Sequence, residues 1–143
     1  MLRRLAIALL LVLPVFPLAT AVSAVEGESI ASLKVAAVVT ETGALHITET
    51  ISYDFGSNAR HGIIRFIPRW DDLPNNQRRQ YDLHLEAVTV DGQAATVTQS
   101  DEGAFHLLTI GDPDVTLSGA HTYVVSFAIS NALPVLTAAD LTN

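Results

Sequence analysis

Cysteine is absent from the 143 residues of the chain, and this absence excludes several kinds of chemistry. No disulfide can join distant segments, no thiol can act as a nucleophile, and no thiolate can ligate zinc. A lipid-bearing cysteine of the lipoprotein type is excluded for the same reason. The stability of the fold must therefore come from its hydrophobic core.

Long apolar runs are also scarce, and the clearest one lies near the N-terminus. Residues 5–13 are apolar without interruption, two arginines precede them, and prolines and small residues follow. This order is typical of a secretory signal peptide that is cleaved after Ala24, with Ala21 as the alternative. An uncleaved membrane anchor is less favoured, because a bilayer span needs about 20 apolar residues. We predict a signal peptide over residues 1–24 and an exported, extracytoplasmic product that contacts the membrane through this segment alone and is secreted once it is cleaved.

Basic residues are few after the leader: six remain against fifteen acidic residues, which gives a formal charge of −9. An acidic surface of this size argues against nucleic acid or an anionic membrane as a general partner. Five of the six basic residues are arginines that lie between positions 60 and 79. Basic charge is thus concentrated in one short segment of an acidic chain.

Alternation of apolar and polar residues dominates the chain after the leader, and this period of two is typical of half-buried strands. Strands are expected near residues 30–39, 45–55, 63–67, 83–90, 95–99, 105–110 and 121–130. We predict an all-β domain over residues 25–132, an antiparallel immunoglobulin-like β-sandwich of about seven strands. A small barrel is the alternative.

Turn signals separate these expected strands. Gly43 indicates an antiparallel hairpin between the first two, and Asp91-Gly92 is a strong hairpin signal after which residues 95–99 should pair back. Residues 68–80 contain prolines, asparagines and paired charges, and we expect them to form a long loop across one end of the sandwich. Residues 133–143 are predicted to be a tail, the start of a truncated further segment.

Arginine is the residue type that makes the basic segment a candidate binding site, because its planar guanidinium suits carboxylates and phosphates. Arg60, Arg65, Arg69 and Trp70 are the residues that we expect to form a binding surface, with Trp70 as a buried anchor. Such a surface would recognise an anion or a partner.

Internal pairing is the competing interpretation of the same arginines, because ion pairs at surfaces and rims are common. On this interpretation Arg60 or Arg65 bridges to an acidic residue of the neighbouring strand, either Asp54 or Glu49. The remaining pairs would join the two arginines at 78 and 79 to the two aspartates at 71 and 72.

Histidine raises the question of a metal site, since His46, His84 and His106 each stand between apolar strand residues and are expected to face outward. Three imidazoles brought together can ligate zinc, but no H-x-H or H-E-x-x-H pattern places them together. No serine elbow occurs, and the adjacent aspartates cannot be given acid and base roles. We therefore expect no catalytic residue, no metal and no cofactor, and a protein that is not an enzyme.

Four segments together resemble a known family. The first runs from Gly43 to Phe55 and has the form G-x-L-x-I-x-E-x-I-x-Y-x-F, and the second, from residue 60 to residue 68, contains R-x-G-I-x-R. The Asp-Gly hairpin and the sequence G-x-H-T-Y at residues 119–123 complete the set. Over about residues 30–132 the chain resembles the N-terminal extracytoplasmic domain of the bacterial predicted membrane proteins called domain of unknown function 2207.

The resemblance implies an extracytoplasmic location and, for the full-length family, attachment to the membrane. It brings no activity, cofactor or catalytic residue. Our first hypothesis is a non-catalytic interaction or sensing module of a bacterial membrane protein, whose partner is a protein or another envelope component. One alternative is a domain that binds or processes an envelope polysaccharide, with Trp70 and Tyr81 stacking on sugars. The other is a structural spacer.

Overall fold

A computed structural model describes residues 27–132 of the chain, and the regular structure within them is almost wholly β. The one other element is a 3₁₀ turn, η1 (Pro74–Asn76). The strands in chain order are β1 (Ser29–Val39), β2 (Leu45–Asp54), β3 (Gly62–Pro68), β4 (Trp70–Leu73), β5 (Gln77–Gln80), β6 (Asp82–Val90), β7 (Gln93–Ala94), β8 (Val97–Glu102), β9 (Phe105–Gly111) and β10 (Ala120–Ser130).

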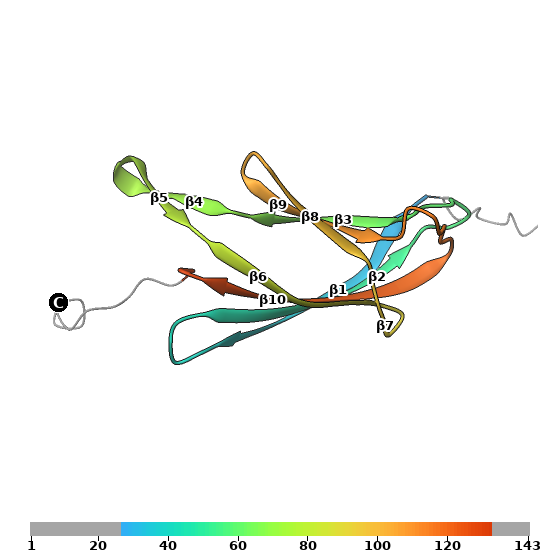
Figure 1. Ribbon diagram of the computed structural model, residues 1–143, viewed down its shortest axis with the longest axis horizontal. Helices are drawn as coiled ribbons and strands as arrows, with labels where there is room; N and C mark the ends of the chain where they lie inside the picture. The colour runs from blue at the N-terminus through green and yellow to red at the C-terminus, as the bar shows by residue number, and fades with distance from the viewer. Residues whose placement is uncertain (1–26, 133–143) are drawn as a thin grey trace, which may run out of the picture.

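The strands form antiparallel sheets, two of which face each other across the interior (Figure 1). The larger sheet has the order β1-β2-β10-β6-β7, and the smaller has the order β3-β9-β8. Strands β4 and β5 form a two-stranded sheet of their own, which projects from one end of the molecule (Figure 1). The chain crosses between the two large layers after β2, again from β3 to β6 by way of the β4–β5 hairpin, after β7 and after β9.

The core fills the space between the two layers. Along β10, the buried residues Tyr123, Val125 and Phe127 alternate with more exposed neighbours, because successive side chains of a strand point to opposite faces. The smaller sheet contributes buried residues from β3 and β9 to the same core. The buried hydrophobic residues of the whole core are Ile51, Phe55, Ile67, Val88, Leu108, Ile110, Tyr123, Val125 and Phe127.

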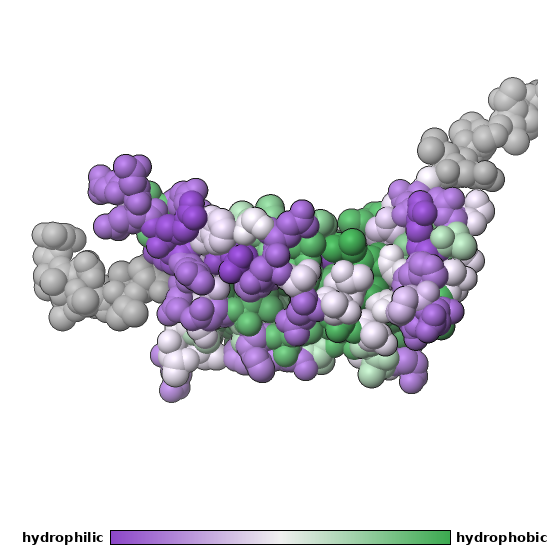
Figure 2. Space-filling model, turned by 45° about the horizontal axis from the view of Figure 1, so that its top comes forward, coloured by the Kyte–Doolittle hydropathy of each residue, from purple (hydrophilic) through white to green (hydrophobic). Residues whose placement is uncertain are grey.

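Apolar residues are not confined to this core. Figure 2 shows a face on which hydrophobic residues gather in the middle, while hydrophilic residues lie towards the two ends. On the outer side of the smaller sheet, Phe66 of β3 and Phe105 of β9 are both exposed and meet edge to face, with ring centroids 5.9 Å apart. This contact supplies local packing without burial.

The all-β prediction is confirmed, and each of the seven expected strands has a counterpart in β1, β2, β3, β6, β8, β9 or β10. Gly43, at a φ of 80°, lies in the turn between β1 and β2, and Asp91-Gly92 closes the turn between β6 and β7. The expected pairing of residues 95–99 with the preceding strand is wrong. Gln93 and Ala94 pair back, and the N–H of Ala95 donates to the Val88 carbonyl at 3.0 Å, after which the chain crosses to the other layer and β8 pairs with β9.

The expected loop over residues 68–80 is also corrected by the structure. Strands β4 and β5 pair in register from Trp70↔Gln80 to Leu73↔Gln77, so the segment is a hairpin. Its tip places Asn75 and Asn76 at positive φ angles of 62° and 57°. Asparagine tolerates this left-handed region better than most residues, and the paired asparagines therefore suit the turn.

Two predictions fall on residues that the structure does not describe. The signal peptide over residues 1–24 and the tail over residues 133–143 both lie outside residues 27–132. Within the described part, no helix is long and apolar enough to cross a bilayer.

Candidate functional site along strand β3

The predicted contact residues are arranged along β3 and its two extensions. Arg60 lies just before the strand, Arg65 lies within it, and Arg69 and Trp70 follow it. At about 3.3 Å per residue, Arg60 and Arg69 are separated by roughly 30 Å. The structure therefore brings Arg69 and Trp70 together and places Arg60 at the opposite end of the molecule.

Arg65 points into the interior and joins the two layers. Its Nε lies 2.7 Å from Oε2 of Glu49, and its Nη2 lies 2.7 Å from Oε1 of the same carboxylate. The Glu49 side chain is only 6 % exposed, whereas that of Arg65 is 32 % exposed. Hydrogen bonding to Glu49 raises the pKa of Arg65, so the guanidinium is held as a cation. Arg65 and Glu49 thus form a bidentate ion pair with each other inside the protein, as the internal-pairing interpretation predicts.

Arg60 is paired with an acidic residue that sequence reasoning did not consider. Its Nε lies 2.5 Å from Oε1 of Glu28, which precedes β1. The same carboxylate accepts hydrogen bonds from the Tyr53 hydroxyl at 3.0 Å and from the Asn58 side-chain amide at 3.2 Å. The hydrogen bond from Arg60 is the main cause that lowers the pKa of Glu28. Glu28 thus connects the residues before β1 to the end of β2 through Tyr53, and to the segment before β3 through Arg60.

Arg69 and Trp70 form a cluster with Arg78 at the base of the projecting hairpin, and we call these three residues the Trp70 cluster. Two guanidinium groups lie over the Trp70 ring, with Cζ of Arg78 4.5 Å and Cζ of Arg69 5.4 Å from the ring centroid. Arg69 also lies 3.2 Å from Asp101, and Arg78 lies 2.8 Å from Asp72. Cation–π contact and ion pairing therefore stabilise the same group of side chains.

The hairpin pairing is only partly as expected. The predicted ion pair of Arg78 with Asp72 is confirmed. Arg79 instead donates to the backbone carbonyl of Ala132 at 3.2 Å, which connects the hairpin to the end of β10. The hairpin is thus anchored on one side through Arg69 and on the other through Arg79.

A polar hollow lies on the hairpin beside the Trp70 cluster. It has a volume of about 570 Å³. Its lining residues, which are mostly amide-bearing or charged, are Asp72, Leu73, Asn76, Gln77 and Arg78. These groups offer several donors and acceptors for a hydroxyl-rich ligand.

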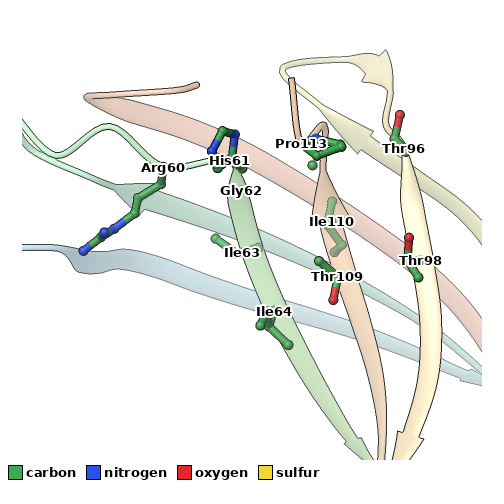
Figure 3. Close-up of a pocket in the computed structure, with 11 residues that line it drawn as sticks. Arg60, His61, Gly62, Ile63, Ile64, Thr96, Thr98, Thr109, Ile110 and Pro113 are labelled. Carbon is green, nitrogen blue, oxygen red and sulfur yellow. The ribbon is translucent and has the colours of Figure 1, made fainter. Parts of the chain in front are cut away.

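A second hollow, at the Arg60 end, was not predicted. It has a volume of about 380 Å³ and lies where Gly62 of β3 pairs with Gly111 of β9. Its lining includes Ile64 of β3, Thr96, which directly precedes β8, and Pro113, which follows β9 (Figure 3). We call it the glycine hollow.

The two glycines of this hollow are required by close backbone contact. Their φ angles are 143° and 149°. A Cβ atom on Gly62 would lie 1.9 Å from the carbonyl oxygen of Ile110, and one on Gly111 would lie 1.8 Å from that of His61. Gly62 was expected to allow a tight entry to the strand, but its partner lies 49 residues away and only the tertiary pairing shows it.

The three histidines considered as metal ligands do not share one layer, because two lie in the larger sheet and one in the smaller. His46 of β2 and His84 of β6 both pair with Ala128 of β10, on the outer face of the larger sheet. His106 belongs to β9 and pairs with the buried Ile67, so its expected outward orientation is wrong. Its Nδ1 lies 2.5 Å from Asp101. Among residues 27–132, no group of three or more histidine, aspartate and glutamate side chains is placed to hold a metal ion.

Comparison with known families gives one match. Residues 29–140 match the family described as "Predicted membrane protein (DUF2207) N-terminal domain". The chain belongs to this family. Searches of curated proteins and of solved structures found no significant match to the chain. The DUF2207 match includes β1 to β10 and therefore the Glu49–Arg65 pair, both hollows and the Trp70 cluster.

Proposed function

We propose that this DUF2207 domain is a non-catalytic interaction or sensing module of a bacterial membrane protein, located outside the cytoplasm. Its two facing antiparallel sheets, with connections that cross between layers, are consistent with an immunoglobulin-like sandwich, and we include that assignment in the proposal. Rigid sandwiches commonly present binding residues on the segments at their ends. The proposed contact surface is the Trp70 cluster, with Arg60 as a separate contact at the other end.

The observation that supports this proposal is the projecting hairpin. Strands β4 and β5 form a sheet apart from the two core layers, and Trp70 at its base is half-buried and in contact with two arginines. Tryptophan and arginine are the side chains most enriched at energetically important interface positions. Among the described residues, none of the three members of the Trp70 cluster belongs to the hydrophobic core. A role in recognition therefore explains their arrangement better than a role in stability does.

Trp70 is the single tryptophan of the full chain, so the tryptophan emission reports this residue alone, and a substitution here removes no other indole. A retention experiment tests the proposed contact surface. The full chain is immobilised and exposed to detergent-solubilised envelope from the source cells. We expect it to retain a defined component, and the double variant Arg69→Gln, Trp70→Ala to lose most of that retention. Lys34→Gln removes the same charge on β1, far from the cluster, and is expected to retain the component as the wild type does.

The melting temperature separates loss of contact from loss of fold. The double variant should melt within a few degrees of the wild type, because the cluster lies outside the core. Equal retention by the wild type and the double variant would show that the Trp70 cluster is not the contact surface. Retention of nothing by the wild type would leave the domain as a structural spacer.

Binding of an envelope polysaccharide is the second candidate, and the polar hollow on the hairpin favours it. Asn76 and Gln77 present amides next to the charged pair of Asp72 and Arg78. Titration with soluble envelope polysaccharide should then change the fluorescence of Trp70, and Asn76→Ala with Gln77→Ala should weaken the response. Unchanged fluorescence at saturating polysaccharide would exclude this candidate.

A further inference from the structure

Strand β1 is a long edge of the larger sheet. It runs over eleven residues, Ser29–Val39, and pairs along its length with β2. On its other side, no strand among residues 27–132 pairs with it. An edge of this kind presents a row of backbone N–H and C=O groups to which another strand can add.

The side chains of β1 are as unusual as its position. Five of its aliphatic residues are more than half exposed: Ile30, Leu33, Val35, Val38 and Val39. Leu33 and Val35 pair with the buried residues Ile51 and Glu49, so they point to the inner side of the sheet. They remain exposed there because the buried core residues of the larger sheet belong to β2, β10 and β6. The exposed aliphatic residues of this inner side, Leu33, Val35 and Val39, form apolar surface of the kind that marks an interaction site.

The other sheet edges carry features that discourage further pairing. Strand β7 has only two residues. Strand β3 directs Arg65 inward and ends at Pro68, and β8 carries Asp101 and Glu102. Short length, inward charge, proline and surface charge are the usual ways in which proteins protect an edge. Strand β1 carries less of this protection: over eleven residues it has one register shift, near Ile30, and one charged residue, Lys34.

We propose that β1 pairs antiparallel with β1 of a second copy of this chain, which joins the two larger sheets across a twofold axis. Charge favours this occupant. The chain has a net charge of −7, whereas Ser29–Val39 contains no acidic residue, so this strand lets two copies meet without opposing carboxylates. Its inner side is also self-complementary, because Leu33, Val35, Ala37 and Val39 are all aliphatic. Isologous dimers of this symmetry are the commonest oligomers.

The side-chain pattern excludes one register of this pairing, and the exposed, β-branched Val35 favours another. Centred on Lys34, it would place two ammonium groups opposite each other, which destabilises an antiparallel pair. Centred on Val35, it places Val35 opposite its own copy and Leu33 opposite Ala37 on the inner side, while Lys34 faces Ala36. The proposal therefore commits to Val35 at the twofold axis.

The absence of cysteine makes a crosslinking test unambiguous. Single variants from Leu33→Cys to Ala37→Cys are made in the full chain, purified under reducing conditions, treated with a mild oxidant and separated on a non-reducing gel. Directly opposed strand residues have Cα separations that a disulfide accepts, about 4.5–5.5 Å. We expect Val35→Cys to give several-fold more disulfide-linked dimer than Leu33→Cys or Ala37→Cys. Ser100→Cys, on the exposed edge strand β8, is the matched control and should stay monomeric.

A second pair of variants tests the dimer without a crosslink. Val35→Lys puts two ammonium groups at the axis, each opposite the Glu49 carboxylate of its own chain, and should abolish the dimer in sedimentation equilibrium, whereas the β-branched Val35→Thr should keep it. Because Val35 is 57 % exposed, the circular dichroism of both variants should match that of the wild type.

Several results would overturn the proposal. Crosslinking of Val35→Cys no stronger than that of Ser100→Cys would show that the edge is not a dimer interface. A mixed disulfide with a different protein would show that another chain occupies it. A crosslinking maximum elsewhere along β1 would reject the register centred on Val35.

Discussion

Glu49 of β2 and Arg65 of β3 face each other across the interior and connect the two layers by two hydrogen bonds of 2.7 Å. The carboxylate is almost completely buried, and the guanidinium reaches it from a partly exposed position. The pair therefore closes one side of the core with opposite charges. Its effect on stability is unequal for the two partners, because only the carboxylate lacks access to water.

Arg65→Met should be strongly destabilising, since it leaves the Glu49 carboxylate buried without its cation. Removing one partner of a buried pair costs about 3 kcal/mol of unfolding free energy. The double variant Arg65→Met, Glu49→Met should recover most of that loss, because two apolar side chains of similar length can pack between the sheets. Urea unfolding of the two single variants and the double variant measures the coupling. An Arg65→Met protein with the urea midpoint of the wild type would contradict this account.

Gly62→Ala and Gly111→Ala should each destabilise the protein by roughly 2–4 kcal/mol, because a Cβ atom there meets a backbone carbonyl and φ is positive. Gly92→Ala is the matched control. Its φ is also positive, at 80°, but an added Cβ meets nothing within 4 Å. It should cost only about 1 kcal/mol, from backbone strain alone. Equal losses at Gly92 and Gly62 in thermal unfolding would show that the close contact between β3 and β9 is unimportant.

Tyr123→Phe should stabilise the protein. Tyr123 is completely buried, and its hydroxyl has no hydrogen-bond partner among residues 27–132. Removing a buried, unpaired hydroxyl is expected to gain about 1 kcal/mol. Tyr53→Phe is the contrasting variant, because the Tyr53 hydroxyl donates to Glu28, and it should lower stability. Urea unfolding at neutral pH that finds Tyr123→Phe less stable than the wild type would refute the prediction.

The same tyrosine predicts a loss of stability in alkali. Burial raises the pKa of Tyr123 to about 12 from its ordinary value of 10.0. The folded state therefore holds the Tyr123 proton more tightly than the unfolded state does. The unfolding free energy is unaffected by this group below pH 10 and falls as the pH rises towards 12. Tyr123→Phe should therefore flatten the decline of unfolding free energy between pH 10 and pH 12. A decline of unchanged slope in the variant would assign it to other groups.

The sequence allowed the central strands to be predicted because one face of each is buried, whereas β1, which has no buried residue, was predicted from its content of valine and alanine. In β10, the spacing of Tyr123, Val125 and Phe127 by two residues directly reflects their burial. The hairpin of β4 and β5 escaped prediction for the opposite reason. It contributes no buried residue to the core, so no alternation marks it.

The candidate site was predictable residue by residue but not as an arrangement. Pairing of Arg65 with a carboxylate of β2 followed from charge and strand order, yet the choice of Glu49 over Asp54 depends on how the layers face each other. Glu28 was missed as the partner of Arg60 because it is 32 residues away and precedes the first strand. The glycine hollow depends on a contact between Gly62 and Gly111 that no local pattern reveals.

Asp91 and His121 predict a loss of stability in acid. The Asp91 carboxylate accepts the Thr122 backbone N–H at 2.8 Å and lies 2.7 Å from Nδ1 of His121. The bond from Thr122, followed by that from His121, lowers the pKa of Asp91 below its ordinary value of 3.8. Because the pKa is lowered in the folded state, the stabilisation is present above about pH 4 and is lost as the pH falls through the folded-state value.

Asp91→Asn separates this effect from a change in the turn. Asparagine tolerates the positive φ of 50° at this position and can still accept the N–H of Thr122, but it has no charge to lose. The variant should be less stable than the wild type at pH 6, and the two unfolding free energies should converge as the pH falls below 4. Thermal unfolding monitored by circular dichroism between pH 2.5 and pH 6 measures both curves. If the difference between the two proteins stays constant over that range, the Asp91 carboxylate does not couple folding to protonation.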